Sequence, residues 1–132
     1  MIYLAGGDSA TDTSNSLSVK NRGGSKFAVF WESAVDDFGL PQGPGLVECS
    51  DGCKYSGEWE TAFFEKGKVV PWVTGTCHIT YPDGSVYEGF VESSNEPKKL
   101  LWRYGRGTLT SPAGRKEEGW WYNDKLARGN TD

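Results

Sequence analysis

The stretch YPDGSVYEGF, residues 81–90, places a Pro-Asp-Gly turn between Tyr81 and Tyr87. Asp-Gly between residues that favour strands is a strong signal for a β-hairpin. A two-residue turn would mix apolar and polar side chains on both faces of that hairpin. A three-residue loop over 82–84, with Gly84 in the left-handed region, separates them. The stretch therefore predicts a hairpin with a bulged, three-residue loop.

This loop fixes which residues face one another across the hairpin. Ile79 opposes Tyr87 and Cys77 opposes Gly89 on one face. The other face is mostly polar and carries His78, Thr80, Val86 and Glu88. Strict alternation of this kind is typical of a half-buried hairpin, because successive side chains of a strand point to opposite sides.

The same pattern recurs along the chain. It is clear in GPGLVECSDGCKYSGEW (43–59), GTCHITYPDGSVYEGFV (75–91) and GRGTLTSPAGRKEEGWW (105–121), and degenerate in NSLSVKNRGGSKFAVFW (15–31). The turn glycines are Gly24, Gly52, Gly84 and Gly114, at separations of 28, 32 and 30 residues. Every block has the same length, so all the variation falls in the connections. A constant unit with variable joints is typical of a repeat array.

Composition agrees with an all-β chain and excludes several classes of protein. The 132 residues include 18 glycines and 18 aromatic residues, a mixture that disfavours helices. A net charge of −4 argues against a nucleic-acid partner. The first residues lack the basic region of a signal peptide, and three cysteines do not form a secreted disulfide framework. We expect a cytoplasmic or other reducing compartment, with membrane or cytoskeletal association left open, and no secretion.

The repeated segments DGCKYSGEWE, DGSVYEGFVE and, more loosely, AGRKEEGWWYNDK resemble the MORN (membrane occupation and recognition nexus) repeat. In the third segment Glu117 and Ala113 depart from the pattern's Tyr and Asp. The resemblance implies an elongated array of about four antiparallel β-hairpins, the first degenerate, joined by long connections. We expect a tail over residues 1–14 and a single domain over 15–132. Members of the family mostly serve as scaffolds or interaction modules, and some associate with membranes.

The residue types that carry metal or thiol chemistry are few and are separated by the predicted register. Cys49 and Cys53 flank a turn, whereas Cys77 lies at the other end of its strand, about 13 Å away along the strand direction. A zinc ion needs convergent ligands, so we expect no metal and no cofactor. Cys49 and Cys53 oppose each other, and two buried thiols are favoured over a strained disulfide.

No arrangement of catalytic residues emerges from the sequence. The single histidine, His78, is predicted on the polar face, and the adjacent Cys77 points the opposite way. The sequence Gly105-Arg106-Gly107 has no following helix to bind a phosphate. We therefore expect a protein that is not an enzyme.

The connections are the candidate binding segments. Residues 96–106, EPKKLLWRYGR, interleave basic and aromatic side chains in an acidic chain, and residues 63–73 add a further tryptophan. Arginine beside aromatic residues is common at interfaces. The predicted partner-binding residues are Lys98, Lys99, Trp102, Arg103, Tyr104, Arg106 and Trp72, with Trp102 and Arg103 at the centre. The alternative is that the apolar residues cover the sheet while the charges are solvated.

These features predict a non-catalytic scaffold or accessory subunit that docks a protein partner in a larger assembly. Its open sheet edges and aromatic residues suit that role. The alternative is a peripheral membrane adaptor in which residues 96–106 contact anionic lipid headgroups.

Overall fold

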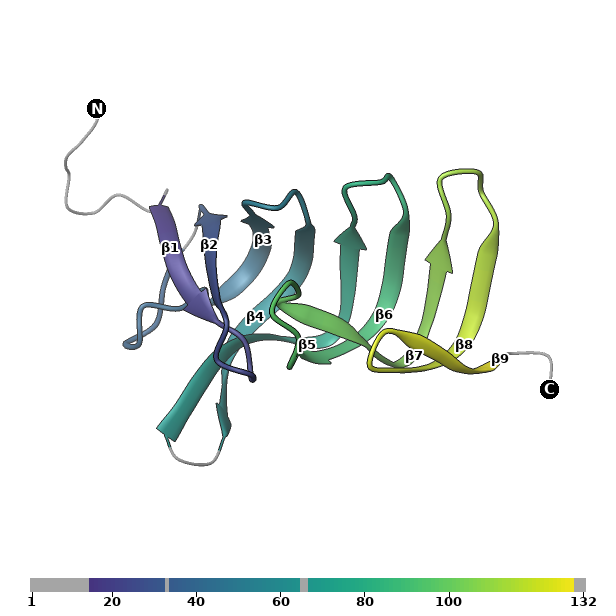
Figure 1. Ribbon diagram of the computed structural model, residues 1–132. Helices are drawn as coiled ribbons and strands as arrows, with labels where there is room; N and C mark the ends of the chain where they lie inside the picture. The colour runs from purple at the N-terminus through teal and green to yellow at the C-terminus, as the bar shows by residue number, and fades with distance from the viewer. Residues whose placement is uncertain (1–14, 33, 65–66, 130–132) are drawn as a thin grey trace.

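The computed structural model describes residues 15–32, 34–64 and 67–129, so the predicted tail over 1–14 lies outside the described residues. Within them, nine strands form one open antiparallel sheet in chain order, with β1 and β9 at its two ends (Figure 1). The strands are β1 (Asn15–Lys20), β2 (Lys26–Trp31), β3 (Gly43–Cys49), β4 (Lys54–Phe64), β5 (Lys68–Thr80), β6 (Val86–Ser93), β7 (Leu101–Thr110), β8 (Lys116–Tyr122) and β9 (Lys125–Gly129). The predicted all-β class is confirmed.

The predicted hairpin turns have one common geometry. In the turn between β5 and β6, the Tyr81 amide donates to the Ser85 carbonyl at 2.9 Å, and the Gly84 amide donates to the Tyr81 carbonyl at 3.0 Å. The turns that contain Gly24, Gly52 and Gly114 repeat both bonds, and all four glycines have positive φ. The three-residue loop is therefore confirmed, and three of the turns lie side by side along the upper edge of Figure 1.

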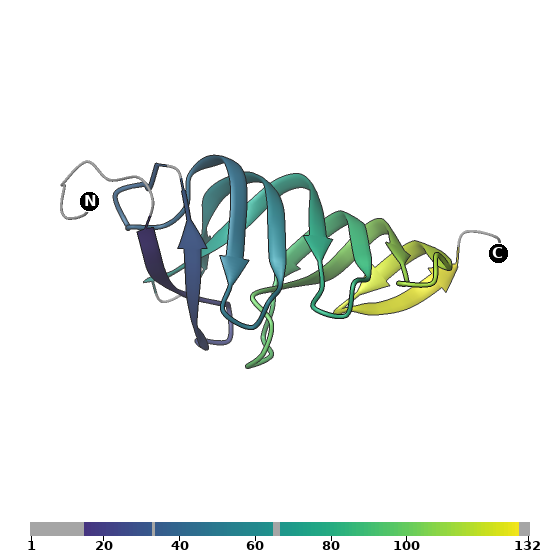
Figure 2. The same ribbon diagram turned by 90° about the horizontal axis from the view of Figure 1, so that it is seen from above.

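The predicted register is confirmed as well. Ile79 pairs with Tyr87 and Cys77 pairs with Gly89. Between β3 and β4, Val47 pairs with Tyr55. The degenerate block 15–31 also forms a complete hairpin from β1 and β2. Figure 2 shows the hairpins following one another from the N-terminal to the C-terminal end.

Two of the three connections between the repeat hairpins continue the strand pairing of the sheet. Past a bulge between Ser56 and Glu58, β4 and β5 stay paired as far as Phe64 and Lys68. Strands β6 and β7 continue in the same way past a bulge at Gly89. A bulge adds one residue to one strand and bends it. These two connections thus extend the paired strands away from the repeat turns.

The inner face of the sheet, which carries Tyr55 and Tyr87, forms the core. Two tryptophans make the same contact in different hairpins: the Nε1 of Trp59 donates to the Gly45 carbonyl, and the Nε1 of Trp121 donates to the Gly107 carbonyl, both at 3.0 Å. The other large buried side chains are Trp31, Ile79, Leu100, Leu101 and several valines. A buried indole needs a partner for its N–H, and the repeat supplies one at an equivalent carbonyl.

In two of the hairpins, a glycine of the first strand makes room for the preceding hairpin. A Cβ on Gly45 would lie 2.9 Å from the Trp31 ring, and a Cβ on Gly107 would overlap the Tyr87 ring. Two glycines of the second strands are also in close contacts. Gly57 faces a methyl group of Val73, and Gly89 faces the backbone of the next hairpin.

The first hairpin turn is held by a segment far along the chain. The buried Asn21 side chain donates to the carbonyls of Glu96 and Lys99, at 2.7 and 2.8 Å. The Arg22 amide donates to the Ser93 hydroxyl. A buried amide with several hydrogen bonds specifies one arrangement. The connection between β6 and β7 therefore contacts the chain's own first hairpin.

Candidate functional site

The structure divides the seven predicted partner-binding residues into buried and exposed groups. Trp102 is 7% exposed, and it follows the buried Leu100 and Leu101. Placing Trp102 at the centre of an exposed contact is therefore wrong. The strand β7 begins at Leu101 and pairs with β6 there, so this part of the segment covers the chain's own sheet. The alternative interpretation, in which the apolar residues of the segment cover the sheet, therefore applies to Leu100, Leu101 and Trp102.

Trp72 and Lys99 also make contacts within the chain. The indole of Trp72 is half-buried, and its Nε1 donates to the Val91 carbonyl at 3.1 Å. Lys99 forms an ion pair with Asp124. Lys98, by contrast, is exposed.

Arg103 is the centre of a polar network that ties β7 to the turn before β9. Its amide donates to Oδ1 of Asp124 at 2.8 Å, and its Nη2 donates to the Asp124 carbonyl at 2.7 Å. Its Nη1 donates to the hydroxyl of Tyr81 at 2.9 Å, and its guanidinium lies over the Trp121 ring. Burial raises the pKa of Tyr81, so the phenol stays protonated. Arg103 thus has a structural role in this network.

A cavity of about 400 Å³ adjoins this network. Its lining includes Tyr55, Tyr81, Lys98, Lys99 and Arg103. Lys99 and Arg103 both pair with the single carboxylate of Asp124, so both side chains are held by contacts within the chain.

Two further exposed residues of the prediction, Tyr104 and Arg106, belong to a larger cluster on the outer face. Arg106 pairs across the ladder with Trp120, and Trp120 pairs in turn with Arg128. The Arg106 guanidinium lies 5.5 Å from the centre of the Trp120 ring. The Tyr104 and Tyr122 rings are 5.3 Å apart. We call Tyr104, Arg106, Trp120 and Tyr122, together with Arg128 by its position in the register, the Trp120 cluster.

Trp120 differs from its neighbour Trp121 in exposure. Trp120 is 49% exposed, whereas Trp121 is 4% exposed. The sequence analysis did not include Trp120 or Tyr122 among the candidate residues. The signal was present for Trp120, because the register that places Trp121 on the inner face places Trp120 on the outer face.

Exposed aromatic residues recur at the position of Trp120 in other hairpins. Phe30 and Phe90 occupy the equivalent position, and each is more than two-fifths exposed. In the second hairpin, Glu58 occupies the position equivalent to Trp120. The outer face therefore carries aromatic side chains towards both ends of the sheet.

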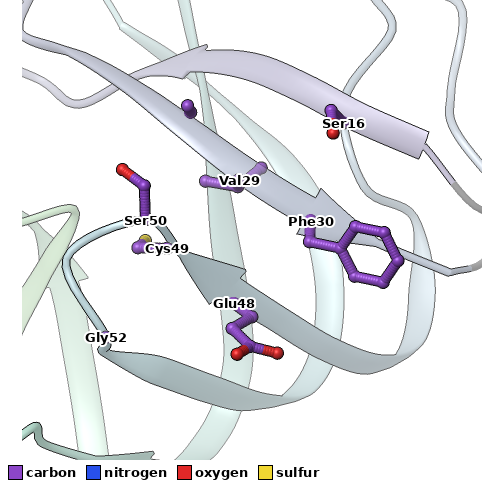
Figure 3. A pocket seen from close by; sticks show the side chains of 8 residues that line it. Ser16, Val29, Phe30, Glu48, Cys49, Ser50 and Gly52 are labelled. Carbon is purple, nitrogen blue, oxygen red and sulfur yellow. The ribbon is translucent and has the colours of Figure 1, made fainter.

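A hollow lies beside Phe30, where β2 and β3 pair over only three residue positions. Two adjoining cavities, of about 390 and 340 Å³, share Phe30 and Glu48 in their linings. Figure 3 shows these two side chains projecting from neighbouring strands. Leu46 and Glu32 line the second cavity. We call the hollow lined by Phe30, Glu32, Leu46 and Glu48 the Phe30 groove.

The three cysteines are buried and carry free thiols. Burial raises the pKa of Cys49 and of Cys77 to about 12, and that of Cys53 to about 11. No group of three or more His, Cys, Asp or Glu side chains within the described residues is placed to hold a metal ion. The thiols are therefore protonated at neutral pH and fill space in the core.

Comparison with known proteins finds no family model and no curated protein that matches this chain. Within the residues that the structure describes, no helix is long and apolar enough to span a bilayer.

Proposed function

We propose that this chain is a non-catalytic scaffold or accessory subunit, a short array of MORN-like repeats that docks a protein partner in a larger assembly. The observation that carries the proposal is the Trp120 cluster. It gathers an exposed tryptophan, two exposed tyrosines and Arg106 on one face of the sheet, and Arg128 lies opposite Trp120 in the register. Tryptophan, tyrosine and arginine are the residues that contribute most to protein–protein binding.

The separation of the two faces supports the same proposal. The inner face buries its aromatic residues in the core, which accounts for Trp121 and Tyr87. Packing within the chain leaves Trp120 and Tyr122 about half exposed. Exposed aromatic side chains that gather in one place mark interaction surfaces.

The proposal gives the chain no catalytic role. His78 lies on the outer face, with its Nδ1 3.7 Å from a carboxylate oxygen of Glu88. Cys77 is buried on the inner face. A catalytic pair needs its two groups within hydrogen-bonding reach of each other, and these neighbours point to opposite sides of the sheet.

The test is recovery of partners from the native source with matched variants of the tagged chain. Trp120→Ala combined with Arg106→Ala should lose the bound partner while the far-ultraviolet circular dichroism stays unchanged. Glu88→Ala, on the same outer face, is the control and should retain it. Equal recovery with both variants would contradict the proposal.

A second candidate is contact with anionic lipid headgroups. One observation favours it: Lys98 and Arg106 are both exposed in the C-terminal third of the chain. Each basic residue near an anionic surface contributes about 1 kcal/mol. Sedimentation with phosphatidylserine vesicles, against phosphatidylcholine vesicles as control, tests it. Binding to the first alone, weakened by Arg106→Glu, would favour the membrane adaptor.

A further inference from the structure

Charge is unevenly distributed along the sheet. Residues 98–132 contain eight Lys or Arg and four Asp or Glu, a net charge of +4. Residues 1–97 contain six and fourteen, a net charge of −8. Because the strands follow one another in chain order, this difference separates a basic end at β9 from an acidic remainder.

The outer face has two exposed apolar surfaces, the Trp120 cluster and the Phe30 groove, and charged residues of opposite sign lie beside them. The Trp120 cluster places Arg106 and Arg128 on either side of an exposed indole. The Phe30 groove places Glu32 and Glu48 beside two exposed apolar side chains. One surface projects a large ring, and the other is hollow and is lined by Phe30 and Leu46.

Charges on both surfaces are available for a partner. Within the described residues, Arg106, Glu32 and Glu48 form no ion pair. Lys54 lies opposite Glu48 across the ladder and is the nearest competing cation in the register. Complementary potentials of this kind direct association and select the partner.

We propose that the Trp120 cluster binds the Phe30 groove of a second copy of this chain. The indole of Trp120 occupies the hollow beside Phe30 and Leu46, and Arg106 and Arg128 pair with Glu32 and Glu48. Both surfaces lie on the outer face, so the two copies meet face to face with the basic end of one at the acidic end of the other. Pairing of two basic ends would be repulsive, which excludes a contact between the β9 edges.

This inference rests on the proposed function, because it uses the same cluster and names its partner. The two remain separable by experiment. Self-association is measured on the purified chain alone, whereas the proposed function is tested by recovery of other proteins. A chain that stays monomeric but retains a partner through Trp120 would overturn the inference only.

The test is a set of charge reversals measured by sedimentation velocity at low ionic strength over a wide range of concentrations. Arg106→Glu with Arg128→Glu should weaken self-association at least about 100-fold, because like charges would then face each other. Glu32→Arg with Glu48→Arg should weaken it equally. The chain that carries all four reversals should associate again, and so should a mixture of the two double variants.

Arg115→Glu with Lys116→Glu is the matched control. It changes the net charge by the same amount at exposed positions outside the cluster and should leave association unchanged. Circular dichroism confirms that each variant is folded. A wild-type chain that is monomeric throughout, or a folded four-reversal chain that fails to associate, would overturn the proposal.

Discussion

The ring of Tyr87 occupies the space that a side chain at Gly107 would need. A Cβ on Gly107 would overlap the hydroxyl and ring carbons of Tyr87. The two residues belong to successive hairpins, in β6 and β7, and Tyr87 is completely buried. The contact therefore shows how one hairpin fits against the next: an aromatic ring of one packs over a glycine of the other.

Gly107→Ala should lower the free energy of unfolding by about 2 kcal/mol, because overpacking a tight core typically costs 1–3 kcal/mol. The neighbouring Thr108→Ala, on the outer face, should change it by less than about 0.5 kcal/mol. Urea denaturation of both variants measures the difference. Similar stability of the two would show that Gly107 is not in contact with the ring.

Tyr87→Ala should lower the free energy of unfolding by about 3 kcal/mol or more, since it removes a fully buried ring. It also removes the hydrogen bond from the Tyr87 hydroxyl to the Phe90 carbonyl. Glu88→Ala, which is exposed on the opposite face, should have an effect below about 0.5 kcal/mol. In the Tyr87→Ala background, Gly107→Ala should cost less than it does alone. Additive effects in this double-mutant cycle would rule out the packing of ring over glycine.

Asp124→Asn should lower the free energy of unfolding by about 3 kcal/mol, because it leaves Lys99 and Arg103 without their carboxylate. Asparagine tolerates the positive φ of 71° at this position, so the backbone of the turn is preserved. Asn123→Gly, at φ 47° in the same turn, is the control and should be nearly neutral. Equal effects would mean that the turn geometry, and not the carboxylate, is what matters.

Stability should fall at alkaline pH because of the buried thiols. Burial raises the pKa of Cys49 from 9.0 to about 12. Between these values the unfolded chain releases a proton that the folded chain keeps, so unfolding becomes more favourable as pH rises. The free energy of unfolding should not vary with this group below about pH 9 and should fall from there towards pH 12. Cys49→Ala should show a smaller fall, and an identical pH profile would contradict the assignment.

The local pattern of the sequence predicts the repeat hairpins well. Alternation around Gly84 predicts the pairing of Ile79 with Tyr87, because a turn and its two strands are set by neighbouring residues. The same rule places Trp120 and Trp121 on opposite faces. What alternation cannot supply is a bulge, since one extra residue changes the register without an obvious signal.

The candidate site is harder to predict for the same physical reason. Beyond the bulge at Gly89 the strands β6 and β7 pair again, and this pairing buries Trp102. The pairing of Arg103 with Asp124 joins residues 21 positions apart through a turn with positive φ. The contact of Asn21 with Glu96 spans 75 positions. Such contacts form only when distant parts of the completed sheet come together. A local sequence pattern does not predict them.

The adjacent tryptophans of β8 provide the most direct test, because Trp121 lies in the core and Trp120 in the proposed binding surface. The measurement is the free energy of unfolding of Trp120→Ala and Trp121→Ala by urea denaturation. It is made at a low protein concentration, so that association does not contribute. We predict a loss of about 3 kcal/mol or more for Trp121→Ala and of less than about 0.5 kcal/mol for Trp120→Ala. Equal losses, or a larger loss for Trp120→Ala, would contradict the division into a buried inner face and a binding outer face.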